Sequence, residues 1–102
     1  MYAKVVTFEI KPGKRDEVVR LVRDFVVPGA RKHKGFKGGV LLTDPKTGKS
    51  KSVGFWETEG DIQASEASGY YKEWVDKLSV HFSSQPTKEI FEVSNFVNIS
   101  LG

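Results

Sequence analysis

The sequence predicts an α+β domain of the ferredoxin-like type, in which two helices cover one face of a four-stranded antiparallel sheet. The order of the elements leads to this fold class, and the chain length and the lack of cysteine are compatible with it. Apolar residues alternate or recur at helical spacing in the order β-α-β-β-α-β. The chain has 102 residues, a common size for one unit, so we expect a single domain over residues 1–102. It contains no cysteine, which excludes disulfides and thiolate metal sites.

The first two elements are a strand and a helix. Residues 2–10 alternate along their length, and the strand ends at Pro12, which lacks a backbone donor. Residues 15–32 carry apolar side chains at the three-and-four spacing of a half-buried helix. Pro28 lies inside this pattern, so we expect the helix to be kinked near residues 25–27.

A hairpin and a second helix follow. Residues 36–43 and 50–58 are typical of strands, and the short loop at 44–48 predicts that they pair antiparallel. The second helix starts around Asp61, a suitable N-cap residue, and carries an apolar stripe as far as Leu78.

The second helix contains Gly69, where we expect an irregularity. A polar connection then leads to a last strand at residues 89–97, and the pattern is compatible with its continuation through 98–102. The strands together carry more large apolar side chains than one sheet face can hold. We therefore expect the face without helices to be covered by a second copy of the chain, which makes the protein a homodimer.

Four short segments carry a family resemblance. They are the turn after the first strand (Phe-Glu-Ile-Lys-Pro-Gly-Lys, residues 8–14), the hairpin loop (Asp-Pro-Lys-Thr-Gly, 44–48), the strand end Phe-Trp-Glu (55–57) and the helical Ser-Gly-Tyr-Tyr-Lys-Glu-Trp (68–74). With their order, the chain resembles the antibiotic biosynthesis monooxygenase (ABM)-type domain of the dimeric α+β barrel superfamily over residues 2–97.

The resemblance implies a cofactor-independent monooxygenase that oxidises a small quinol- or phenol-like molecule with molecular oxygen. The alternative is a non-catalytic dimeric α+β barrel that binds a small apolar ligand, for instance a stress-response protein. Haem-degrading relatives place a histidine on the second helix. In this chain neither His33 nor His81 falls at that position, so the resemblance does not extend to haem, and we expect no cofactor.

The expected pocket lies between the sheet and the helices. We expect Trp56, Tyr71, Trp74 and Phe91 to line it and to bind an aromatic substrate, although aromatic residues at helical spacing also serve simply as core. His81, just beyond the second helix, is the candidate acid–base group because histidine titrates near neutral pH. An exposed loop histidine is the alternative.

Other partners are not supported. The two histidines lack metal-ligand spacing, so we expect no metal site. An RNA-recognition module has the same element order, but residues 51–55 match its aromatic motif only in part, and the net charge of +3 is modest for a phosphate binder. No apolar run approaches the roughly 20 residues of a membrane span, and no signal-peptide core is present. We therefore expect a cytoplasmic protein.

Overall fold

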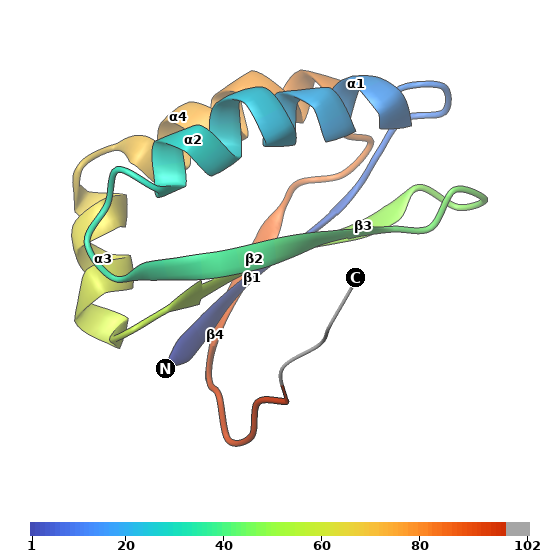
Figure 1. Ribbon diagram of the computed structural model, residues 1–102. Coiled ribbons are helices and arrows are strands. Elements are labelled where there is room, and N and C mark those ends of the chain that lie inside the picture. The colour runs from blue at the N-terminus through green and yellow to red at the C-terminus, as the bar shows by residue number, and fades with distance from the viewer. Residues whose placement is uncertain (98–102) are drawn as a thin grey trace.

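The computed structural model describes residues 1–97. A four-stranded antiparallel sheet lies beneath a layer of helices (Figure 1). The strand order is β2-β3-β1-β4, with β1 (Tyr2–Glu9), β2 (Phe36–Thr43), β3 (Lys49–Trp56) and β4 (Thr87–Glu92). The helices are α1 (Arg15–Leu21), η1 (Val22–Val26), α2 (Val27–Ala30), α3 (Glu59–Ala67), α4 (Tyr70–Leu78) and η2 (Ser79–His81). This arrangement confirms the predicted ferredoxin-like fold.

The first helical segment runs without a break through α1, η1 and α2, but its middle is a π-helical turn over Val22–Val26. Pro28 follows in the first turn of α2 and has no backbone N–H to donate to the preceding turn. The irregularity expected near residues 25–27 is thus accommodated by wider winding. Among the helices of residues 1–97, none combines the length and the apolar character that crossing a membrane requires.

The second helical segment differs from the prediction at its start and in its middle. The N-cap residue is Thr58, whose side-chain oxygen accepts a hydrogen bond of 3.0 Å from the Asp61 N–H, so Asp61 itself lies within the first turn of α3. Gly69 has a φ of +89°, which glycine adopts readily, and the chain changes direction there between α3 and α4. The expected irregularity is therefore a complete break.

The core lies between the helices and one face of the sheet. Alternate residues of β1, namely Val6 and Phe8, point toward the helices and are almost fully buried, as is Ile10 just beyond the strand. They pack against Val18 of α1 and Leu78 of α4, among others. The first strand therefore fixes which sheet face the helices cover.

The opposite sheet face carries exposed apolar side chains. Val40, Leu42, Phe91 and Phe96 are each at least half exposed, and the Phe96 ring lies edge-on to Phe55 with centroids 5.8 Å apart. The division of large apolar residues between two faces agrees with the sequence pattern. The last strand is shorter than predicted, because it ends at Glu92 rather than at residue 97. Its expected continuation through 98–102 lies outside the described residues.

Candidate functional site

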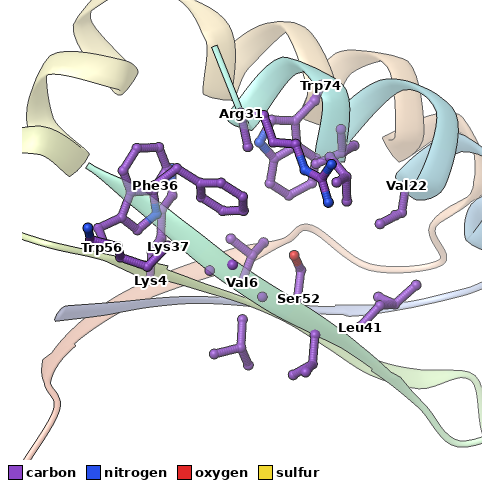
Figure 2. A pocket seen from close by; sticks show the side chains of 18 of the residues that line it. Lys4, Val6, Val22, Arg31, Phe36, Lys37, Leu41, Ser52, Trp56 and Trp74 are labelled. Atoms are coloured by element: carbon purple, nitrogen blue, oxygen red, sulfur yellow. The ribbon is translucent and has the colours of Figure 1, made fainter. Parts of the chain in front are cut away.

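A cavity of about 430 Å³ opens between the helices and the β2–β3 side of the sheet (Figure 2). Its floor is made of small residues, because Gly39 of β2 pairs with Gly54 of β3 and Ser52 is the next residue on that face. A Cβ at Gly39 would lie only 2.5 Å from the Val53 carbonyl oxygen, so this position requires glycine. The paired glycines leave the space beneath α2 that a larger pair would fill.

A β-bulge at the start of β2 adds an aromatic ring to the cavity. Phe36 pairs with Trp56, whereas Gly38 already pairs with Phe55, so one extra residue is inserted opposite β3. Gly38 accommodates this with a φ of +136°. The bulge turns the Phe36 ring to the helix-covered face, where it meets the Trp56 indole edge-on at 5.3 Å between centroids.

Two tryptophans form much of the wall. Trp56 is the last residue of β3 and Trp74 lies in the middle of α4. Both are buried and line the cavity (Figure 2). Behind Trp74, the Tyr71 ring contacts it edge-on with centroids 5.4 Å apart. Edge-to-face contact is a favoured arrangement of aromatic rings, and these pairs give the wall an apolar surface.

The roof is fixed by a hydrogen bond between two helices. The Tyr70 hydroxyl of α4 donates to the Val26 carbonyl in the π-helical turn, and the Tyr70 ring packs directly on Gly29. Burial raises the pKa of Tyr70 to about 12, so its hydroxyl stays protonated and remains a donor. The turn that covers the cavity is thereby anchored to α4.

Lys4 of β1 is the buried charged group of the site. Its side chain points to the helix-covered face beside Val6, only 7% of the residue is exposed, and it lines the cavity (Figure 2). Burial lowers the pKa of Lys4 to about 8, against the opposing attraction of Glu66. A lysine with such a pKa exchanges its proton near neutral pH and can serve as a base.

Lys4 belongs to a small charged cluster beside the cavity. Its ammonium lies 3.4 Å from one carboxylate oxygen of Glu66 and 3.7 Å from the centroid of the Tyr71 ring. Lys88 of β4 donates to the other oxygen of Glu66. Burial opposes ionisation of Glu66, but Lys88 and Lys4 outweigh it, so the pKa of Glu66 is lowered. The carboxylate is therefore ionised at neutral pH.

The charged residues lining the cavity are all cationic. Besides Lys4 they are Arg31, which follows α2, and Lys37, the extra residue of the bulge. Figure 2 shows the Arg31 side chain reaching from the helices toward the sheet. Lys37 also lies 3.6 Å from Glu57, in a pair that is more than half exposed. The lining thus offers positive charge around an apolar, aromatic interior.

The structure brings together only some of the residues expected at the site. Trp56 and Trp74 line the cavity, and Tyr71 stands behind Trp74 without lining it. Phe91 pairs with Ala3 and points to the helix-free sheet face, where it is half exposed. His81 lies in η2, beyond the end of α4 that is remote from Tyr70, and its carbonyl accepts a hydrogen bond of 2.8 Å from the Lys11 N–H.

The sequence analysis missed Lys4, Arg31, Phe36 and Tyr70 as site residues. One signal was present, since Lys4 alternates with apolar residues on the strand face that proves to be buried. No sequence signal identified Phe36 as a site residue, because the orientation of its side chain depends on the bulge. Within residues 1–97, no group of three or more histidine, aspartate or glutamate side chains is arranged to hold a metal ion.

The sequence matches the model of the antibiotic biosynthesis monooxygenase family over residues 1–77, a segment that contains every residue lining the cavity. The chain belongs to this family. No curated protein shows a significant match to the ABM chain described here.

Solved structures share the fold at low sequence identity. The monooxygenase ActVA-Orf6 of Streptomyces coelicolor, solved with the ligand nanaomycin D, is 19% identical and has a TM-score of 0.80, with 97% of this chain and 92% of that chain covered. Rv0793 from Mycobacterium tuberculosis is 12% identical with a TM-score of 0.73, covering 95% and 98%. A conserved protein from Methanosarcina mazei is 19% identical with a TM-score of 0.73, covering 89% and 91%. At these identities the likeness establishes the fold of the ABM domain.

Proposed function

We propose that the ABM chain is a monooxygenase that oxidises a small aromatic, phenol- or quinol-like substrate with molecular oxygen and without a bound cofactor. The observation that carries the proposal is the cavity of about 430 Å³ walled by Trp56, Trp74 and Phe36. Cavities of roughly 300–1,000 Å³ with apolar walls and a few polar groups are typical small-molecule sites. Family membership and the nanaomycin D ligand of a structural relative support an aromatic ligand.

In the proposed reaction the substrate itself supplies the electrons that reduce oxygen. A phenol that gives up its proton becomes electron-rich enough to reduce oxygen. One oxygen atom then enters a ring carbon as a carbonyl, the other leaves as water, and the two electron pairs needed come from the substrate. In this reaction the residues bind and orient the ring, exclude water and accept the phenolic proton. His81 is not among the residues that line the cavity, so we assign it no catalytic role.

The test is oxygen consumption by the purified protein with a panel of anthrones, quinols and polyphenols, measured against the spontaneous rate. Ser52→Leu places a larger apolar side chain in the cavity and is expected to abolish consumption above that rate. Ser84→Leu changes an exposed serine outside the cavity and serves as the matched control. If panel compounds bind but no oxygen is consumed, the protein is not an oxygenase, and the non-catalytic ligand-binding barrel is the function to adopt.

We further propose that the protein is a homodimer in which two copies join through the helix-free sheet faces. The support is the cluster of half-exposed apolar side chains on that face, which water would otherwise solvate at a cost of about 25 cal/mol per Å² of apolar surface. A sheet face is self-complementary about a two-fold axis, as a dimer of identical chains requires.

A further inference from the structure

When Lys4 is protonated, the charges around it do not balance without a ligand. Two ammonium groups, those of Lys4 and Lys88, face the single carboxylate of Glu66. Lys88 donates directly to one oxygen of that carboxylate and can neutralise it alone. Lys4 approaches the second oxygen only to 3.4 Å, and that oxygen is buried with no hydrogen-bond partner in the described part of the chain. The cluster is therefore neutral while Lys4 is an amine, and it holds one positive charge in excess once Lys4 has gained a proton.

The excess charge is placed on the cavity side of the cluster. Lys4 lines the cavity, whereas Glu66 and Lys88 do not. The other charged lining residues, Arg31 and Lys37, are also cationic, and among residues 1–97 the lining includes no aspartate or glutamate. A ligand that enters this space finds positive charge and no negative charge in contact with it. An anion is consequently favoured over a neutral molecule of the same shape.

The walls determine which kind of anion fits. Trp56, Trp74 and Phe36 surround the cavity with aromatic surface, and the paired glycines of its floor leave room for a flat ring. A strongly hydrated inorganic anion would gain little from such walls, whereas an aromatic ring with one ionised oxygen buries its ring and presents the charge to Lys4.

We infer that the ligand is bound as a phenolate and that Lys4 takes the phenolic proton and then holds the oxygen anion. This inference rests on the proposed function and names the ionisation state of its substrate. The step is a proton transfer: the phenol O–H bond breaks, the neutral Lys4 amine gains the proton, and an ammonium–phenolate pair remains. The total charge of the cavity and cluster does not change, so the proton transfer requires no additional net charge to be buried.

The surroundings keep Lys4 ready for this role. Three neighbouring elements each contribute one group, namely Glu66 from α3, Lys88 from β4 and the Tyr71 ring from α4, whereas β3 places Gly54 beside Lys4 and Arg31 lines the same cavity. Lys88 lowers the cost of a neutral Lys4 because it already compensates Glu66. The Tyr71 ring faces the Lys4 ammonium at 3.7 Å and favours its charged form after the transfer. Tyr71 is a positioning residue in this scheme.

The experiment uses 4-nitrophenol as the probe, because its absorption spectrum distinguishes the phenol from the phenolate. The intact protein is titrated with the probe over a range of pH, and the pKa of the bound phenol is compared with that of the free phenol. We expect binding to lower this pKa by about one unit, equivalent to roughly tenfold tighter binding of the phenolate. The methyl ether 4-nitroanisole, which has no proton to lose, reports on the cavity alone.

Variants separate the role of Lys4 from that of the cavity. Lys4→Met is expected to abolish the pKa shift of bound 4-nitrophenol while 4-nitroanisole still binds. Lys4→Arg is expected to keep tight phenolate binding, because the charge remains, but to lower oxygen consumption at neutral pH, because arginine does not accept the proton. Lys46→Met, at an exposed lysine of the hairpin loop, is expected to behave as the unaltered protein.

The outcomes distinguish the two proposals. If the unaltered protein binds both probes but leaves the pKa of 4-nitrophenol unshifted, the inference about Lys4 is wrong while the cavity remains a ligand site. The same holds if Lys4→Met retains the shift. If neither probe binds and no panel substrate consumes oxygen, the proposed function fails instead. The titration of the unaltered protein decides the matter even if Lys4→Met does not fold.

Discussion

The Tyr70 hydroxyl donates a hydrogen bond to the backbone carbonyl of Val26 and thereby ties the start of α4 to the π-helical turn above the cavity. A wider helical turn followed by Pro28 leaves backbone carbonyls without their usual partners inside the helix. The Tyr70 hydroxyl adds a donor from a neighbouring helix to this segment, at the Val26 carbonyl. The shape of the cavity roof is thus a property of two helices rather than of one.

Removal of this hydroxyl is expected to weaken the fold. Tyr70→Phe removes a part-buried hydrogen bond between two helices, and such a bond contributes about 0.5–1.5 kcal/mol to stability. Urea denaturation of the variant should show a free energy of unfolding lower by that amount. Tyr2→Phe, which removes a phenolic hydroxyl outside this contact, is the control. Equal stability of Tyr70→Phe and the unaltered protein would contradict the role of the hydrogen bond.

Gly29 is expected to resist substitution for a reason that helix propensity does not predict. Alanine normally stabilises a helix interior relative to glycine by about 1 kcal/mol. At Gly29, however, the added Cβ would lie 2.5 Å from Cε1 of Tyr70, so the ring or the helix must move. We expect Gly29→Ala to lower the free energy of unfolding by about 1–3 kcal/mol.

Gly60→Ala in α3 is the matched control for this change. Its Cβ would have Thr58 Oγ1 at 3.7 Å as its nearest neighbour, an ordinary van der Waals contact. This substitution should leave the stability unchanged or raise it slightly. A gain in stability for both alanine variants, measured by thermal unfolding, would mean that Tyr70 moves aside freely.

The fold was predictable because the sheet and helix patterns are local. Alternation placed Lys4, Val6 and Phe8 on one strand face, and the order of elements then determined the topology. The N-cap was misassigned to Asp61 because Thr58 is an equally good capping residue three positions earlier.

The site was less predictable because it depends on register. The cavity exists because Gly39 pairs with Gly54, which a sequence alone does not reveal. The importance of Lys4 depends on Glu66 and Lys88, which come from two elements far from β1 in the sequence. The expected placement of Phe91 in the pocket did not allow for the register of β4, which points that ring to the other sheet face.

Lys4 should leave a signature in the pH dependence of stability. Its pKa is about 8 in the folded chain and 10.5 as the ordinary value, so between these pH values the unfolded chain holds more protons. The free energy of unfolding therefore rises with pH in this window, whereas below pH 8 both states are protonated and the cost of burying the charge is present in full. We expect a rise of about 1–2 kcal/mol from pH 8 to 10.

Comparison with Lys4→Met isolates this contribution, since the tyrosines and other lysines titrate in both proteins. Urea denaturation at several pH values should show the rise in the unaltered protein and in the exposed-site control Lys46→Met, but not in Lys4→Met. Parallel pH profiles for all three proteins would show that Lys4 is not desolvated in solution, and the basis for its role as a base would be lost.

The proposed dimer predicts that one charge on the helix-free face separates the copies. Phe91→Lys places an ammonium on the helix-free sheet face, beside Ala3 of β1, where a second chain would have to bury it. We expect the unaltered protein to sediment at micromolar concentration with twice the chain mass of 11.4 kDa, and Phe91→Lys to sediment as a monomer. Val80→Lys, at an exposed apolar residue of η2 away from the sheet, should remain a dimer. If Val80→Lys dissociates the dimer and Phe91→Lys does not, the interface lies on the helical side. If the unaltered protein sediments as a monomer, the proposed dimer is wrong.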